Sequence, residues 1–331
     1  MMKNLICMAL LALMPAAGGL KAAGEERITV DEWLTVEVTA PGMLVPALED
    51  ALAQLEPWHP YDLLDVKLRL SGTLDASDVR WLRWLTGAKN SLTWMIGDDD
   101  PAEGYGHTRV TALDLGQATL QTGGWYAHVQ TTGSEFYMLD SDDTLGPELF
   151  AESRFLSQLV LPEGVRVVQK ATVSSTVSDL TLPSTLGQVE AGELKWATTV
   201  TCLAVEPPVV TQFEYGSGRD NQDYRDGTYT PIMFDPRVTA DWQLLEPWRK
   251  ELKGHTLVVP AGTKEKYAVS GVWSCFGTIV EADVTTDVAA VRAADKGSEP
   301  AYTLGGRLMR PTEKGFGIAK SRLWRGPRRG Q

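Results

Sequence analysis

The sequence predicts a strand-rich α/β fold, in which a short solenoid with parallel strands follows an N-terminal capping region with short helices. The main observation is one short pattern written three times, with copies that begin at Leu156, Val177 and Val200. In each copy an apolar, strand-like run ends at or near a proline, which lacks a backbone donor and stops a strand ladder. Because no single copy of about 22 residues can bury both of its faces, the copies are expected to stack and form one parallel sheet.

Each copy is expected to contribute one strand to that sheet. After the first two copies, apolar residues at 165–168 and 186–189 predict a loose second strand or turn that returns the chain. The main strands themselves are predicted at 159–161, 180–182 and 203–205.

The period is interrupted after the third copy. We interpret residues 211–254 as an insertion, in which one or two helical turns begin at Asp241. The strand-then-proline pattern restarts at 256–260. A short helix over 264–269 and a strand-like run over 273–281 are expected after it.

The capping region begins with strand-like runs at 28–30 and 33–38, followed by a turn at 40–42. The alternation of apolar and charged residues over 64–70 predicts a half-buried strand. Between the turn and this strand, leucines that recur every three or four residues predict a helix: Leu44, Leu48, Leu52 and Leu55.

Residues 71–74 are expected to turn the chain, and residues 110–118 to form another strand closed by a polar turn. Between them, Asp75 or Ser77 is expected to cap a short helix. On that helix Trp81 and Trp84 are three residues apart, which favours packing over an exposed sugar-stacking surface. The helix places three apolar residues on one side: Val79, Leu82 and Leu85.

The first residues are typical of a secretory signal peptide. Lys3 supplies a positive start, residues 5–17 are apolar, and small residues then predict cleavage between residues 19 and 24. Lipidation of Cys7 is disfavoured because this cysteine precedes most of the apolar run. No other run is apolar and long enough to cross a membrane, so we expect a secreted or outer-surface protein.

Charge and cysteine content narrow the classes of partner. The chain carries −12 overall. Residues 1–24 contribute +2 and residues 306–331 contribute +7, so the part between these two basic ends is strongly acidic. This balance argues against a nucleic-acid partner for the folded part. After cleavage only Cys202 and Cys275 remain, and both lie in apolar runs that predict buried thiols; a disulfide between them stays open.

At the repeated pattern the chain resembles the BspA-like leucine-rich-repeat surface proteins exported by Bacteroidetes. Their repeat, Leu-x-x-Ile-x-Leu-Pro-x-x-Val-x-x-Ile, is matched by 156–168 and 177–189. The resemblance covers about 60–280 and implies a leucine-rich-repeat-like solenoid. Segments that often close such proteins correspond here to 204–208, 257–267 and 273–281.

The chain also departs from this family. The Ala-Phe pair that usually follows the second strand is replaced by Ala171-Thr172 and Ala191-Gly192, and the insertion at 211–254 is longer than usual. Residues 302–318 are similar to C-terminal tails that serve as sorting signals in that phylum, although this copy ends in arginines. The resemblance implies adhesion to, or recognition of, a host or matrix protein.

No constellation of catalytic, cofactor-binding or metal-ligating residues is expected. The four histidines (His59, His107, His128 and His255) are scattered without zinc-ligand spacing, and neither a Gly-x-Ser-x-Gly elbow nor a phosphate-binding glycine loop occurs. The acidic runs 98–100 and 140–143 lack the spacing of an EF-hand loop and favour solvated loops over calcium ligation.

The sequence therefore predicts a non-catalytic exported protein that binds proteins through its solenoid. The alternative is a glycan-binding surface module that uses exposed tryptophans such as Trp125, Trp242 and Trp248. The expected division is a signal peptide at 1–24, a capping region with degenerate repeats at 25–150, a repeat region at 151–282, and a linker with a basic tail at 283–331.

Overall fold

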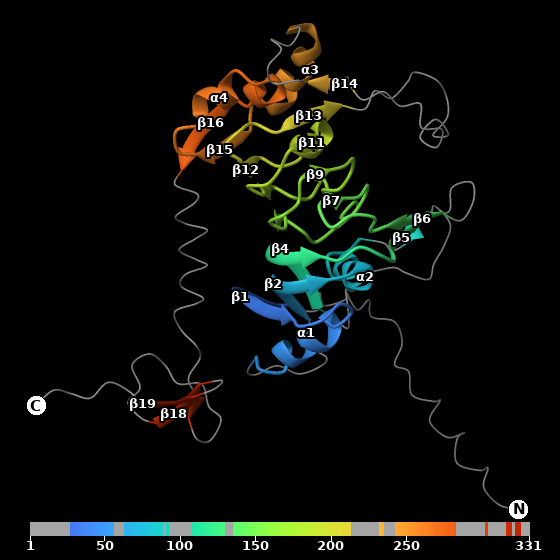
Figure 1. Ribbon diagram of the computed structural model, residues 1–331, viewed down its shortest axis with the longest axis vertical. Helices are drawn as coiled ribbons and strands as arrows, with labels where there is room; N and C mark the ends of the chain where they lie inside the picture. Colours follow the sequence, from blue (N-terminus) through green and yellow to red (C-terminus); the bar gives the residue numbers. More distant parts are fainter. Residues whose placement is uncertain are drawn as a thin grey trace, which may run out of the picture.

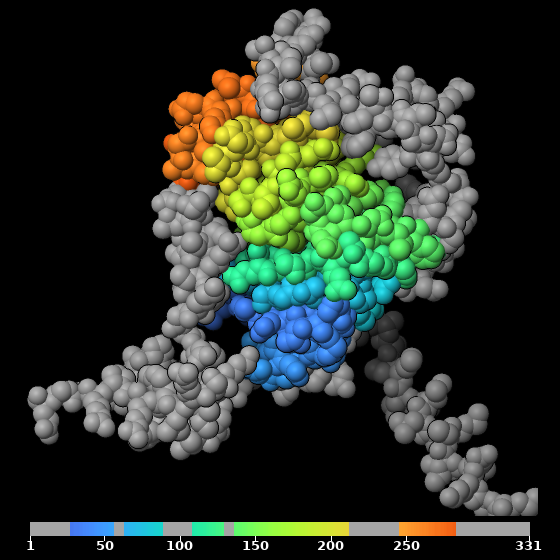
Figure 2. All heavy atoms as spheres, in the orientation of Figure 1, coloured from blue at the N-terminus to red at the C-terminus, as the bar shows by residue number. Residues whose placement is uncertain are grey.

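The computed structural model describes residues 27–55, 63–88, 91–92, 108–129, 135–212, 232–234, 242–282, 302–303, 316–319 and 322–325. Its body is a strand-rich, mixed α/β fold organised around a large parallel sheet (Figure 1). Successive segments of the chain lie as layers along the long axis, from β1 at one end to β16 at the other (Figure 2). The predicted α/β class and the parallel sheet are confirmed.

The large sheet has eight strands, and every neighbouring pair is parallel. Their order in space follows their order in the chain, so each crossover returns the chain to the next position along the sheet. The strands are β1 (Ile28–Val38), β2 (Leu64–Leu74), β4 (Thr108–Leu120), β8 (Gln158–Val160), β10 (Asp179–Leu182), β12 (Thr199–Cys202), β15 (Thr256–Pro260) and β16 (Thr278–Ala282).

One aliphatic row crosses all eight strands on the inner face of this sheet. Parallel pairing in register places equivalent positions side by side, so the row continues from strand to strand. Its six inner members are buried, and the two at the sheet edges are half-buried. Each buried aliphatic side chain contributes about 1.5–3 kcal/mol of transfer free energy. The row is Leu34, Leu68, Leu113, Leu159, Leu180, Val200, Leu257 and Ile279.

Shorter strands form three further sheets. The predicted return segments at 165–168 and 186–189 contain β9 (Val167–Val168) and β11 (Gln188–Glu190) of a five-stranded sheet, which β7 (Thr144–Leu145), β13 (Val209–Gln212) and β14 (Ile232–Phe234) complete. A second small sheet contains β3 (Ser91–Leu92), β5 (Trp125–Val129) and β6 (Glu135–Met138). The third contains β17 (Tyr302–Thr303), β18 (Phe316–Ala319) and β19 (Arg322–Arg325).

The helices α1 (Leu44–Leu52) and α2 (Ala76–Leu85) lie where the sequence predicts them. Asp75 caps α2 by accepting hydrogen bonds from the Ser77 and Asp78 amides. Asp78 reaches back and accepts from the backbone N–H groups of Gly42 and Leu44, which ties the start of α1 to α2. The predicted helix at 264–269 is present as α4 (Lys264–Ala268), and short 3₁₀ segments form η2 (Ala191–Leu194) and η3 (Gly271–Cys275).

Three local predictions are wrong. The third strand lies at 199–202 rather than 203–205, because Val200, not Leu203, pairs with Leu180 in the aliphatic row. Residues 71–74 continue β2 instead of turning, and β4 likewise runs past residue 118 to Leu120. Gly72 of β2 pairs in register with Ala118, and Gly116 of β4 falls in an irregularity of the β2–β4 pairing, beyond which the ladder resumes.

The insertion also differs from expectation. Helix α3 (Trp242–Leu252) spans 11 residues, about three turns, where one or two turns were expected. Leu245, Trp248 and Leu252 are all buried, and their spacing gives the helix an apolar stripe that packs on the core. Most of the insertion and the predicted linker at 283–300 lie outside the described residues.

Candidate binding surfaces

The outer face of the eight-stranded sheet carries a second row, one residue beyond the aliphatic row on each strand. Because successive side chains point to opposite faces, this row faces outward along the whole sheet. Its members are exposed or half-buried. We call it the outer row: Thr35, Arg69, Asp114, Val160, Thr181, Thr201, Val258 and Val280.

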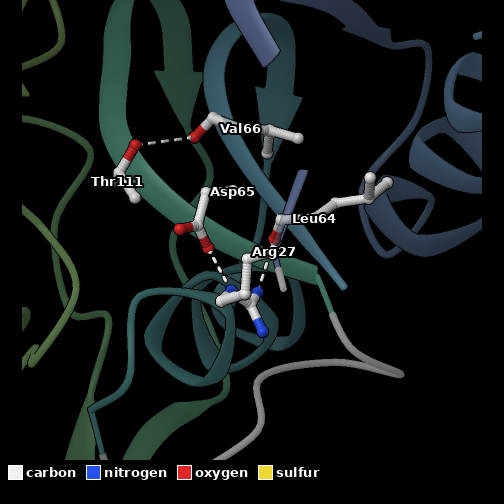
Figure 3. Close-up of polar contacts among 5 residues, drawn as sticks. All are labelled: Arg27, Leu64, Asp65, Val66 and Thr111. Carbon is white, nitrogen blue, oxygen red and sulfur yellow. Dashed lines mark hydrogen bonds and ion pairs between the residues drawn. The ribbon is translucent and has the colours of Figure 1, made fainter. Parts of the chain in front are cut away.

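Ion pairs across neighbouring strands fix the β1–β2–β4 part of this face. Arg69 Nε donates to Asp114 Oδ2 at 2.8 Å, and the Arg69 guanidinium lies 5.0 Å from the centre of the Trp33 ring. Arg27 donates through Nε to Asp65 Oδ1 and through a terminal nitrogen to the Leu64 carbonyl, each at 2.6 Å (Figure 3). These contacts pair the carboxylates of Asp65 and Asp114 each with a guanidinium and help to hold the strands in register.

A hydrogen bond from a side chain to a backbone carbonyl also links two of these strands. The Thr111 hydroxyl donates to the Val66 carbonyl at 3.2 Å (Figure 3). This bond crosses from β4 to β2, next to the pair formed by Arg27 and Asp65. The first three strands therefore form a cross-linked platform of defined shape.

The other five strands present an uncharged part of the outer row, from Val160 to Val280. All five side chains are valine or threonine, whose branched Cβ restricts rotation about χ1. The neighbouring outward positions on the same strands include one carboxylate, Asp179, which accepts a hydrogen bond from the Ser178 hydroxyl at 2.8 Å. This part of the face is therefore a regular array of small, rigid side chains.

A hollow of about 460 Å³ lies at the carboxyl ends of β2 and β4. Thr73, Thr119, Asp142, Asp143 and Glu163 are among its lining residues. Hydrogen bonds from the Ser141 and Thr144 hydroxyls lower the pKa of Asp143, so this carboxyl is ionised at neutral pH. Asp142 accepts from the Thr122 amide, and Glu163 accepts from the Ser184 hydroxyl. The carboxylates thus have partners within the protein.

The acidic and histidine positions form no metal site in the part of the chain that is described, where no group of three or more potential ligands occurs. The run 98–100, His59 and His107 lie outside that part. His128 stacks on Phe136, with ring centres 4.5 Å apart, and His255 is half-buried at the start of β15. The structure does not bring these two histidines together with a cysteine.

Charged groups are buried where α2 meets the 147–153 turn. Burial lowers the pKa of Arg83 to about 10, so the guanidinium remains charged at neutral pH and donates to the carbonyls of Glu148 and Leu149. Burial also raises the pKa of the Glu148 carboxyl, which accepts a hydrogen bond from the Tyr137 hydroxyl. Glu148 has φ +60°, in the left-handed region. Every hydrogen bond described here joins one part of the protein to another, which gives the cluster a structural role.

A second buried carboxyl, that of Glu193, joins separate segments of the chain. It accepts hydrogen bonds from the backbone N–H groups of Ala171 and Val173, at 2.5 and 2.6 Å. Burial raises its pKa to about 8 despite these donors. Glu193 therefore links the 3₁₀ segment η2 to the backbone at residues 171–173.

The cysteines and tryptophans are placed as follows. Cys202 and Cys275 are buried free thiols, and Trp81 stacks on Trp84 while packing against the core. Trp248, expected as an exposed glycan contact, is instead 9% exposed, because α3 turns it into the core. The side chain of Trp242 lies outside what is described.

Trp125, the third tryptophan of the glycan hypothesis, is half-buried. The Arg80 guanidinium lies 4.1 Å from the centre of its ring. Among the tryptophans whose exposure is described, Trp196 is the most exposed, and sequence reasoning did not select it. Trp196 lies next to Lys195 in a polar stretch just before β12, and this position was the sequence signal that could have indicated its exposure.

Compared with known proteins, the chain matches no protein-family model and no curated protein. Among the helices of the described segments, none combines the length and apolar character needed to cross a membrane.

Proposed function

We propose that this chain is a non-catalytic exported or cell-surface protein that binds another protein through the outer face of its eight-stranded sheet. The observation that carries the proposal is the outer row, with one side chain from every strand and β-branched, uncharged residues over five strands. Sites for small molecules are concave and few in number, whereas a broad regular face suits a protein partner.

The registers also support a finer proposal for the fold, a short leucine-rich-repeat-like solenoid of the BspA-like type. Leu159, Leu180 and Val200 are separated by 21 and 20 residues and lie in register on neighbouring strands. The return strands β9 and β11 pair in parallel in the second sheet. Each unit would then contribute to both sheets and bury its core against the next.

Export is part of the proposal and rests on the signal-like residues 1–24. N-terminal sequencing of the protein recovered from its source organism is expected to begin within residues 20–25, and protease added to intact cells is expected to degrade surface-bound protein. Recovery of a chain that still carries residues 1–24, or complete protection from protease together with absence from the medium, would contradict it.

Binding is tested with two charge-matched double variants. Thr181→Arg with Thr201→Arg places two cations in the centre of the outer row. Gln169→Arg with Ser175→Arg places the same charge on exposed positions outside it. Biolayer interferometry against purified matrix and serum proteins is expected to show saturable binding to at least one of them. We expect the outer-row variant to weaken that binding by about tenfold or more, and the control variant to preserve it.

Two outcomes would overturn the proposal. One is equal binding by the two double variants, which would place the contact elsewhere. The other is saturable binding to members of a glycan array with none to the proteins, which would favour the glycan-binding alternative.

A further inference from the structure

The β5–β6 hairpin presents an aromatic surface that lies apart from the eight-stranded sheet. An irregularity in its pairing makes the surface, since Trp125 pairs with Met138 but Ala127 pairs with Tyr137, leaving Tyr126 as an extra residue. Tyr126 and Ala127 are both fully buried as a result. Four residues on paired positions form what we call the hairpin outer face: Trp125, His128, Phe136 and Met138.

Phe136 and Met138 are the exposed part of this face, whereas Trp125 and His128 are half-buried. Phe136 is 47% exposed and Met138 is 42% exposed, both large side chains in contact with solvent. The Phe136 ring centre lies 5.1 Å from that of Trp125 and 4.5 Å from that of His128. Aromatic residues, Met and Arg are enriched in the cores of protein interfaces. The composition of the face therefore favours a protein partner.

The opposite side of the hairpin is anchored to the body. The Tyr126 hydroxyl donates to the Pro147 carbonyl at 2.7 Å, and the Tyr137 hydroxyl donates to Glu148. Arg80 of α2 donates to the Trp125 carbonyl at 3.3 Å. These contacts hold the hairpin in one position, so the face needs little ordering before it binds.

Strand β6 is also an end strand of its sheet among the described residues, where the order is β3-β5-β6. Leu139 exchanges backbone hydrogen bonds with Gly123 and Gly124 on the β5 side. Because backbone groups alternate in direction along a strand, those of Phe136 and Met138 point to the opposite, outer edge. The edge therefore offers donors and acceptors next to two exposed apolar side chains, a combination that templates pairing with another strand.

We infer that two copies of this chain pair through this edge, with their β6 strands antiparallel about a two-fold axis at Tyr137. Phe136 of each copy then lies opposite Met138 of the other, and each of these two pairs exchanges both backbone hydrogen bonds. Each copy contributes the same strand to the contact. Phe136 of one copy and Met138 of the other thereby become cross-strand neighbours. An isologous contact of this kind closes at two subunits.

Charge and area are consistent with a weak dimer of this kind. In the two-fold register Glu135 of one copy lies opposite Leu139 of the other, so like charges do not meet directly across the strands. The contact is limited to a four-residue strand and the hairpin outer face, below the size of stable interfaces. The pairing is therefore expected to be concentration-dependent.

Sedimentation velocity of the full chain tests the proposal. From low micromolar to near-millimolar protein, the weight-average mass is expected to rise toward that of a dimer. Phe136→Lys is expected to weaken this association by about tenfold or more, because it places a charged side chain against Met138 of the other copy. Trp196→Lys alters an equally exposed aromatic residue elsewhere and is expected to associate like the unmodified chain. Circular dichroism melting establishes that both variants are folded.

Disulfide trapping gives a second readout that does not depend on the charge change. Opposed residues in a hydrogen-bonded pair have Cα atoms about 5.5 Å apart, within disulfide range, whereas residues offset by two lie beyond it. Under mild oxidation, a mixture of Phe136→Cys and Met138→Cys chains is expected to form cross-linked dimers, and either variant alone is not. A monomeric chain at all concentrations, association unaffected by Phe136→Lys, or equal cross-linking by the single variants would overturn the inference.

Discussion

Gly72 of β2 lies against the backbone of Val38 in β1, so close that a Cβ at Gly72 would stand 2.1 Å from the Val38 carbonyl oxygen. The two residues are paired across the strands, and Gly72 has φ +92°, in the left-handed region. Both conditions admit glycine and strongly disfavour any side chain. The first two strands of the large sheet therefore depend on this one residue for their close approach.

The first prediction follows from that contact. Gly72→Ala is expected to lower the free energy of unfolding by more than about 3 kcal/mol, because backbone strain and a clash with a main-chain atom add together. Gly164→Ala is the matched control, since Gly164 has φ +99° but nothing within 4 Å of its Cβ position. It is expected to cost about 1–2 kcal/mol. Equal costs in urea denaturation would show that the close approach does not limit stability.

The second prediction concerns Arg83. Arg83→Met leaves the buried carbonyls of Glu148 and Leu149 without their donor, and an unfolding cost of about 3–5 kcal/mol is expected. Arg166→Met, at an exposed position, is expected to change stability by less than about 0.5 kcal/mol. Thermal denaturation of both variants checks this difference, and similar melting temperatures would count against a structural role for Arg83.

The third prediction is a pH dependence set by Glu193. Its pKa is raised from 4.5 to about 8 by burial, and the charged groups that act on it are Glu190 and Lys195. Between these two values the folded chain holds a proton that the unfolded chain has released. Stability contributed by Glu193 is therefore complete below about pH 4.5 and is lost as the pH rises toward about 8.

Glu193→Gln removes this titration. The variant is expected to be less stable at pH 5 by about 1–3 kcal/mol, since an amide can accept only one of the two backbone hydrogen bonds. Its stability is also expected to fall less steeply than that of the unmodified chain as the pH rises to 8. Urea denaturation at several pH values measures both effects, and parallel profiles would contradict the assignment.

The fourth prediction separates two tryptophans. Trp248→Ala is expected to cost about 3–5 kcal/mol because it leaves a cavity beneath α3. Trp196→Ala is expected to cost less than about 1 kcal/mol, because its ring is 44% exposed and contacts the Lys195 ammonium at the surface. Chemical denaturation distinguishes the two, and a small effect of Trp248→Ala would return that residue to the list of surface contacts.

Much of the local structure can be read from residue patterns. The leucines of α1 recur with the helical period of 3.6 residues, and the strand-then-proline runs alternate with the strand period of 2. The helix α2 is marked instead by its capping residue, Asp75. Parallel stacking follows as well, because short apolar strands with no second buried face of their own must share a core. The third strand was misplaced by a few residues, since either Val200 or Leu203 satisfies the same pattern until a partner strand selects one.

The candidate surfaces could be predicted only in part. Thr181, Thr201 and Val258 alternate with buried residues, so their outward direction is visible in the sequence once the strands are known. The hairpin outer face is not visible in this way, because the extra residue Tyr126 breaks the alternation in β5 and puts Trp125 and His128 on paired, outward positions.

The sequence by itself determined the α/β class, the parallel pairing and most element positions, because hydrophobic periodicity acts between residues close in the chain. Only the tertiary structure decided that Trp248 is buried, that Gly72 continues a strand, and that Phe136 and Met138 stand together at an end strand. Each of these depends on which distant segment lies opposite, and a local pattern carries no information about that neighbour.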